Sequence, residues 1–245
     1  MAMERIDKII ASQGLYSRSD VKYMVNRKRI TIDGKVVTSA SQKADVDKNE
    51  ILLDGKPFVV KKQIYLMLHK PKGYVSATED KKQQTVLELV PAELKGRDLF
   101  PAGRLDKDTT GLMILTDDGV LAHNILSPKK HVQKIYRVEL DIPVTEEMQK
   151  GFAEGVELND GVCKEAKLTI LGEKTAEVTL KEGRYHQIKR MFGCYGAKVV
   201  ELHRIAMGEL YLPDDLPEGR CRELTAEDLV KLQTREKETE SLKSH

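Results

Sequence analysis

Apolar residues in the first 60 positions occur in short segments separated by polar turns. Segment 6–10 has the apolar spacing of a helix face, and Gly14 is suited to end this helix, because glycine adopts left-handed backbone conformations at low cost. Ser17 and Asp20 form a near capping box, with Asp in place of the usual Glu or Gln. We therefore predict two short helices, the second with its buried residues in segment 21–25.

Two hairpin signals follow these helices. Asp-Gly pairs separate short apolar segments, 30–32 from 36–37 at Asp33-Gly34 and 51–53 from 58–60 at Asp54-Gly55. Asp-Gly is favoured in two-residue hairpin turns, because both central residues need a positive φ. The pattern predicts that residues 1–60 form a first domain of helices and hairpins.

Residues 61–233 mix strand and helix patterns, followed by a polar tail at 234–245. Strands are predicted at 64–68, 73–77, 112–115, 136–140, 166–170, 176–180, 198–202 and 209–212, and helices at 86–89, 120–126, 185–195 and from the Thr225 cap to 232. Strands outnumber helices and several are joined by short turns. We predict an α+β fold with a mixed, largely antiparallel sheet and a small N-terminal helix-hairpin domain.

Composition fits a globular protein. Hydrophobic residues make up 40% of the chain and the mean hydropathy is −0.44. The longest apolar run, 64–68, is far shorter than the roughly 20 residues of a membrane helix, and charged residues interrupt the first ten positions, where a signal peptide is apolar. We predict a cytoplasmic monomer that makes no membrane contact.

Cysteine and histidine spacing indicates neither a metal nor a cofactor. The three cysteines include no C-x-x-C pair, and the six histidines show no H-E-x-x-H pattern. No G-x-G-x-x-G or Walker loop is present. We expect no metal site and no cofactor.

Basic and acidic residues are segregated along the chain, although the formal net charge is only +2. Segment 22–29 holds four basic residues and no acid, whereas segment 139–160 is strongly acidic. Such sorting is typical of a polyanion-binding groove with an acidic back. Solvated helix faces produce similar runs, so charge alone leaves both interpretations open.

The first domain resembles a known RNA-binding module. Its L-Y-S-R-S-D and N-R-K-R-I-T-I-D-G-K-V-V segments resemble the alpha-L, or ribosomal protein S4-like, RNA-binding domain. The resemblance implies that RNA phosphates meet Ser17, Arg18, Lys22, Arg27, Lys28 and Arg29. Phosphate contacts of this kind give salt-sensitive affinity without reading sequence. The alternative is a small structural domain that binds no RNA.

A polar, glycine-bounded loop at 102–112 precedes an apolar strand and contains Asp106. By position alone, an aspartate in such a loop more often caps its own backbone than takes part in catalysis. However, G-R-L-D-x-D-T-T-G-L, K-I-Y-R-V at 134–138 and G-R-Y-H-Q-I-K-R-M at 183–191 together resemble the RsuA-type pseudouridine synthases, which isomerise a uridine in ribosomal RNA. The resemblance extends over essentially the whole chain.

The resemblance implies a role for each motif residue. Asp106 would be the essential catalytic aspartate, Tyr136 the tyrosine beside the target ring and Lys189 the basic partner of the aspartate. The substrate pocket would be completed by Arg104, Ile188, His186 and Gln187, and RNA would meet Arg184 and Arg190. Many relatives have arginine at the position of Lys189, so the pair here would be a point-charge contact.

Uridine isomerisation explains these residue types. The N1–C1′ bond breaks, the uracil rotates and C5 rejoins the sugar, without redox change. A carboxylate can act as nucleophile or stabilise developing charge, and the residues leave open whether it attacks sugar or base. The target must first be flipped out of folded RNA, where a tyrosine can stack on it and accept the C5 proton.

The form of the third motif resembles small-subunit enzymes more than large-subunit ones, which implies 16S ribosomal RNA, met within a small-subunit assembly intermediate. Two alternatives are a synthase for large-subunit RNA and a non-catalytic assembly factor, which would be expected to lack Asp106. A glycoside hydrolase is disfavoured, because Asp106 and Asp108 are too close in one loop to flank a scissile bond.

Overall fold

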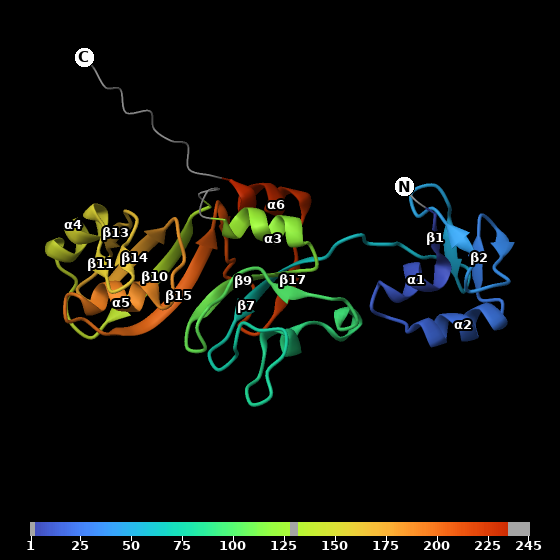
Figure 1. Ribbon diagram of the computed structural model, residues 1–245, viewed down its shortest axis with the longest axis horizontal. Coiled ribbons are helices and arrows are strands. Elements are labelled where there is room, and N and C mark those ends of the chain that lie inside the picture. The colour runs from blue at the N-terminus through green and yellow to red at the C-terminus, as the bar shows by residue number, and fades with distance from the viewer. Residues whose placement is uncertain (1–2, 128–131, 235–245) are drawn as a thin grey trace, which may run out of the picture. The chain divides into compact units, whose positions relative to one another are not determined.

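The computed structural model describes residues 3–127 and 132–234, and its contacts divide the chain into two compact units (Figure 1). The first unit comprises Met1–Ile64 and Val90–Leu99, and the second Tyr65–Leu89 and Phe100–His245. The domain boundaries at 60/61 and 233/234 stay predictions, and nearly all of the predicted tail lies outside the described residues.

The first unit has its own apolar core. Helix α1 (Ile6–Ala11) and helix α2 (Arg18–Asn26) pack together over a four-stranded sheet in the order β3-β2-β5-β6. The strands are β2 (Ile30–Ile32), β3 (Lys35–Val36), β5 (Ile51–Leu53) and β6 (Lys56–Pro57), while β1 (Glu4–Arg5) pairs with β4 (Lys43–Ala44). Isoleucines 6, 9, 10 and 30 are almost wholly buried between them.

Local signals formed as predicted in this unit. Ser17 and Asp20 make a reciprocal capping box at the start of α2. Asp33 and Gly34 both have positive φ, of 49° and 73°, as does the pair at 54 and 55. These are the backbone angles that a two-residue hairpin with right-handed twist needs.

The second unit is built on one mixed sheet of nine strands in the order β13-β14-β10-β15-β9-β7-β17, with β16 beside β15 and β8 beside β9. The strands are β7 (Tyr65–Lys70), β8 (Phe100–Pro101), β9 (Thr110–Thr116), β10 (Lys134–Leu140), β13 (Lys167–Ile170), β14 (Thr175–Leu180), β15 (Val199–Met207), β16 (Leu210–Tyr211) and β17 (Cys221–Glu223). All neighbouring pairs are antiparallel except β9 with β15, which is parallel. The predicted α+β class with a largely antiparallel sheet is therefore confirmed.

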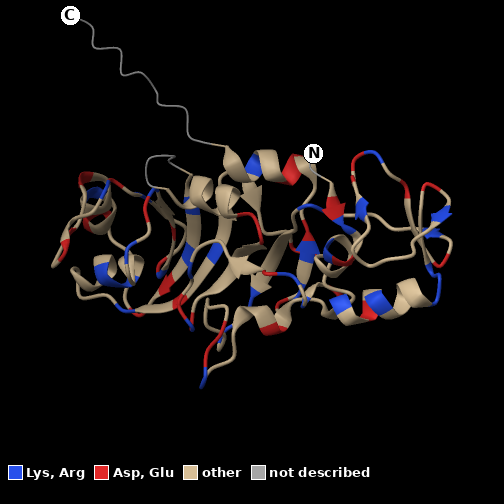
Figure 2. Cartoon of the chain, turned by 45° about the vertical axis from the view of Figure 1, so that its right-hand side comes forward, with Lys and Arg blue, Asp and Glu red and all other residues tan. Residues whose placement is uncertain are grey.

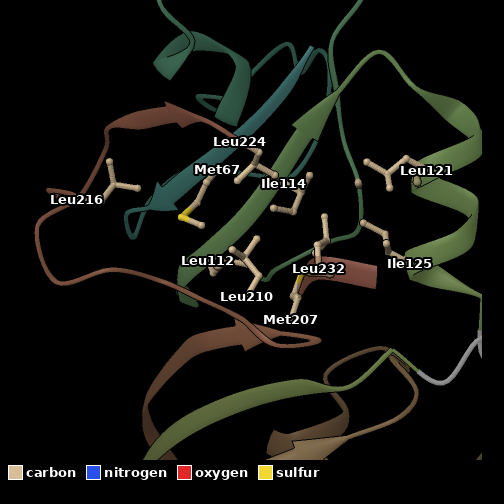
Figure 3. Packing of buried hydrophobic residues seen from close by; sticks show 12 residues of the cluster. Met67, Leu112, Ile114, Leu121, Ile125, Met207, Leu210, Leu216, Leu224 and Leu232 are labelled. Atoms are coloured by element: carbon tan, nitrogen blue, oxygen red, sulfur yellow. The ribbon is translucent and has the colours of Figure 1, made fainter. Parts of the chain in front are cut away.

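Helices α3 (Gly119–Leu126) and α6 (Ala226–Gln233) lie side by side on this sheet (Figure 1). Ile125 and Leu232 meet Leu112 and Ile114 of β9 in an apolar cluster (Figure 3). Burial of such side chains contributes about 1.5–3 kcal/mol each, so this cluster anchors the strand that follows the Asp106 loop.

The other half of the sheet is covered by α4 (Glu146–Glu154) and α5 (Gln187–Gly193). Phe152 of α4 and Phe192 of α5 are fully buried with ring centroids 4.7 Å apart. A two-stranded hairpin, β11 (Glu157–Leu158) with β12 (Gly161–Val162), lies beside α5. Two 3-10 turns complete the described elements, η1 (Val86–Leu89) in this unit and η2 (Ala92–Leu94) in the first.

Several sequence predictions differ from the structure. Segment 58–60 is not a strand, because the strand after the Asp54-Gly55 turn is β6 and ends at Pro57. Segment 73–77 is not a strand and makes a single bridge, from Val75 to Thr85. Helix α5 begins at Gln187 and not at 185, because the left-handed backbone of His186 interrupts it. The acidic segment that starts at 146 was not predicted to be helical, yet Thr145 caps α4 there.

Candidate active site

Asp106 lies in a loop that is braced on both sides by backbone hydrogen bonds. The Ser76 hydroxyl donates to the Leu105 carbonyl at 2.7 Å and accepts from the Leu105 N–H at 2.9 Å. Gly73 N–H donates to the Lys107 carbonyl at 2.8 Å. Segment 73–77 therefore supports the Asp106 loop, which explains why it does not extend as a strand.

A buried lysine fixes the other end of this loop. Lys70 is fully buried, and its ammonium donates to the carbonyls of Pro71 at 3.0 Å and Thr109 at 2.8 Å. Burial lowers the pKa of Lys70 to about 8, although the carboxylates of Asp108 and Asp106 oppose this shift. Lys70 thus holds the loop closed at the end of β7.

The parallel pair β9–β15 fixes the strand that directly follows the Asp106 loop. Gly111 sits against Arg204 with a φ of 106°, and a Cβ at position 111 would overlap the Arg204 carbonyl oxygen. Only glycine allows this approach of the two backbones. The contact holds the C-terminal end of the Asp106 loop against β15.

Two side chains from the start of α5 meet the Asp106 carboxylate. Lys189 Nζ lies 3.2 Å from Oδ2, and His186 Nε2 lies 3.3 Å from Oδ1. Lys189 Nζ also lies 2.6 Å from Asp108 Oδ1. The Asp106 side chain is 26% exposed, so it is partly enclosed yet reachable. The predicted contact between Asp106 and Lys189 is present in the structure.

The ion pairs outweigh burial at Lys189 and Asp108. Burial by itself would lower the pKa of Lys189, but hydrogen bonds and charge from Asp108 and Asp106 raise it above its ordinary value. Burial would raise the pKa of Asp108, but the bond from Lys189 lowers it. Lys189 is therefore an ammonium at neutral pH and supplies fixed positive charge beside Asp106.

A cavity of about 410 Å³ opens in front of Asp106. It brings together residues from all three motifs, and those predicted from the sequence that line it are Arg104, Asp106, Tyr136, Arg184, His186, Gln187, Ile188 and Lys189. Tyr136 is only 8% exposed, so its ring forms part of the cavity wall. A cavity lined by an aromatic ring, an apolar side chain and a carboxylate suits a planar heterocycle joined to a sugar.

Sequence analysis missed two cations that line this cavity. Arg204 is 1% exposed, its Nε donates to the Leu112 carbonyl at 2.7 Å, and its guanidinium lies 6.0 Å from the centre of the Tyr136 ring. Lys134 is also buried, and burial together with the charge of Arg204 lowers its pKa to about 8. Lys134 begins the K-I-Y-R-V motif, and in a strand residues two apart lie on the same face, so Lys134 shares a face with Tyr136. This alternation is the sequence signal that could have predicted Lys134 at the cavity.

Three other predicted site residues bond within the unit. Gln187 accepts from Arg184 N–H at 3.0 Å and donates to Glu182 at 2.7 Å. The Arg184 guanidinium donates to the carbonyls of Gly161 and Val162, and Arg190 makes a two-bond contact with Asp160. These bonds hold the β11–β12 hairpin against α5.

The predicted RNA-facing residues of the first unit are mostly exposed around α2. Arg18, Lys22, Arg27 and Lys28 are exposed, and the basic residues of α2 are visible in Figure 2. Ser17 is occupied in the capping box, and Arg29 pairs with Asp54 at 2.6 Å. Because they are exposed, the side chains of Arg18, Lys22, Arg27 and Lys28 are available to phosphates.

Within the described residues, no cluster of His, Cys, Asp or Glu offers three ligands to a metal ion. Among those same residues, no helix has the length and hydropathy to cross a membrane.

The chain belongs to the RNA pseudouridylate synthase family, because the model of that family matches residues 64–193, which contain the Asp106 loop, Tyr136 and Lys189. An S4 domain model matches residues 4–49. The resemblance to RsuA-type enzymes and the S4-like unit predicted from the sequence are thus confirmed.

Similar proteins extend over almost the whole chain. An uncharacterized RNA pseudouridine synthase of Bacillus subtilis, YtzG, is 43% identical over 92% of this chain and 96% of its own length. Ribosomal small subunit pseudouridine synthase A of Escherichia coli is 40% identical over 92% of this chain and 98% of its own length. A crystal structure of a pseudouridylate synthase superposes with a TM-score of 0.66 at 39% identity, covering 94% of this chain and 99% of that one.

Proposed function

We propose that this protein converts a uridine of small-subunit ribosomal RNA into pseudouridine, with Asp106 as the essential catalytic residue. The observation that carries the proposal is the Asp106 carboxylate, held 3.2 Å from the Lys189 ammonium at a cavity walled by Tyr136 and Ile188. The small-subunit substrate is supported by the relatives that are named ribosomal small subunit pseudouridine synthase A, at about 40% identity.

Lys189 places a positive charge next to the Asp106 carboxylate. The cavity partly removes Asp106 from water, and a carboxylate enclosed without a partner is costly. The Lys189 ammonium offsets that cost, and the His186 ring fixes the second oxygen. Asp106 is thereby held in one orientation, from which it can act as nucleophile or stabilise positive charge as the N1–C1′ bond breaks.

Tyr136 and Ile188 hold the released uracil for rotation. The Tyr136 ring offers a face for stacking and Ile188 an apolar surface, so the base is bound without being locked in one rotational position. After C5 joins C1′, the Tyr136 oxygen takes the C5 proton as its own hydroxyl proton passes to water, and the freed N1 takes a proton from water, so no proton is gained or lost overall. The reaction is an isomerisation, in which no electron is gained or lost overall.

RNA reaches this site only if the uridine leaves its stack, because Asp106 lies inside the cavity. The exposed basic residues of the first unit contact phosphates and position the RNA. Extrusion of the uridine is cheapest before the RNA is fully packed, which favours a small-subunit assembly intermediate as substrate.

The test replaces Asp106 by Asn or Ala and measures tritium release from uracil C5 in small-subunit RNA. Only isomerisation exchanges that hydrogen, so both variants should release none while RNA affinity stays within about threefold. Asp117→Asn, in a loop outside the cavity, serves as the matched control. Turnover by a clean Asp106→Ala preparation would refute the assignment, and RNA binding without tritium release by the unmodified protein would identify a non-catalytic assembly factor.

A further inference from the structure

Tyr185 exposes most of its ring at the cavity rim. The residue is 70% exposed, and its ring lies on the ring of His186 with centroids 3.8 Å apart and planes 17° from parallel. Both rings line the cavity of Asp106. One face of the tyrosine is thus covered by His186, and the exposed area belongs to the opposite face and the edge.

The stacked pair depends on an uncommon backbone conformation. His186 has φ 47° and ψ 35°, in the left-handed region that residues other than glycine rarely adopt. Side chains of consecutive residues point apart in helices and strands, so this residue is what allows the two rings to lie parallel. Residues held in such conformations cluster at active sites and ligand-binding sites. Here it also places His186 Nε2 3.3 Å from Asp106.

When a uridine is flipped out of its stack, the RNA exposes a nucleobase face that an aromatic side chain can cover. The nucleobase next to the flipped position loses a stacking partner, and its bare face needs a new one. Aromatic side chains stack on any base through their π face, which is how proteins bind unstacked nucleotides. The open face of Tyr185 lies beside the cavity that the flipped uracil enters.

We propose that Tyr185, backed by His186, is the stacking site for the nucleobase adjacent to the flipped uridine. The inference rests on the proposed function, because it requires a flipped nucleotide beside Asp106. Tyr185 contributes to binding and selection of the RNA, whereas bond breaking depends on Asp106.

The kinetic test compares Tyr185→Ala, Tyr185→Leu, Tyr185→Phe and Tyr185→Trp. Alanine and leucine should raise KM about tenfold or more with kcat changed less than threefold, since both lack a π face. Phenylalanine and tryptophan should keep KM within about twofold. Tyr211→Ala is the matched control, because Tyr211 is 56% exposed but lies outside the cavity lining. Equal KM values for leucine and phenylalanine, or an alanine variant within twofold of the unmodified enzyme, would overturn the proposal.

A fluorescence test reports the stack directly. RNA carrying 2-aminopurine on either side of the target uridine is bound to Asp106→Asn protein, which holds the complex without turnover. At one of the two positions, adding Tyr185→Ala should raise the fluorescence at least twofold, because the base loses its stacking partner. No change at either position would overturn the proposal. If the unmodified protein releases no tritium from any ribosomal RNA, the proposed function itself has failed, which is a separate result.

Discussion

At the scale of the residue, the site depends on how charges are shared around one carboxylate. Lys189 lies between Asp106 and Asp108, but the Asp108 side chain is 69% exposed, whereas that of Asp106 is 26% exposed. Water screens the outer pair far more strongly than the inner one. Lys189 therefore serves both carboxylates, through a shorter contact with the exposed Asp108 and a less screened contact with Asp106.

Lys189→Met removes this charge and should lower kcat about 100-fold, because Asp106 loses its compensating cation in a partly enclosed site. Lys189→Arg should retain much more activity, since it keeps the charge. Asp108→Asn is the control and should change kcat less than about threefold, given the solvent screening. These rates are measured by tritium release at saturating RNA, and a Lys189→Met enzyme with normal kcat would contradict the role.

Lys134 predicts a pH-dependent stability difference. Burial and Arg204 lower its pKa in the folded protein to about 8, from 10.5, so the unfolded chain binds more protons between these values. Burial of the charged lysine therefore lowers the free energy of unfolding by up to about 3 kcal/mol below pH 8. This loss of stability disappears as the pH rises from 8 to 10.5, because Lys134 then loses its proton in both states. Lys134→Met should be more stable than the unmodified protein at pH 7, and this advantage should fade above pH 8. Urea unfolding at a series of pH values measures the free energy of unfolding of both proteins. A stability difference between them that does not change with pH would contradict the prediction.

At the scale of the element, the parallel pair β9–β15 depends on one glycine. Gly111→Ala would force a Cβ into the Arg204 backbone and strain a φ of 106°. Gly161→Ala is the matched control, because its φ is 104° and no atom lies within 4 Å of the added Cβ. We expect about 1–3 kcal/mol of destabilisation at Gly161 and at least about 2 kcal/mol more at Gly111. Thermal unfolding measures the stability of both variants. Equal losses of stability would contradict a special requirement for glycine where β9 meets β15.

At the scale of the whole molecule, the first unit should act through charge. Replacing Arg18, Lys22 and Lys28 by alanine together removes exposed cations without disturbing the buried residues of α2. RNA affinity should fall, and the slope of log affinity against log salt should become shallower by about two to three, at roughly 0.7–0.9 for each of the phosphate contacts that are lost. Arg29→Ala should change the slope much less, because Asp54 already binds its guanidinium. Titrations at several salt concentrations measure both slopes, and an unchanged slope in the triple variant would contradict this RNA-binding role.

Signals that act over a few neighbouring residues were sufficient to predict much of this protein. The capping box at Ser17, the Asp-Gly turns and the alternation in β10 and β14 each depend on local backbone preferences, so they formed as expected. The motif around Asp106 carried the family resemblance, and its loop position followed from glycine and polar spacing. Helix α4 was missed because its acidic sequence suggested only a charged surface.

The tertiary structure alone decided which side chains meet. The Asp106 contact to Lys189 joins positions far apart in the chain, and no local preference specifies it. The burial of Lys134 and Arg204 and the left-handed turn at His186 depend on packing between β10, β15 and α5. The sequence by itself therefore determined the elements and the chemistry they carry, whereas long-range packing placed one carboxylate, one ammonium and two aromatic rings around a single cavity.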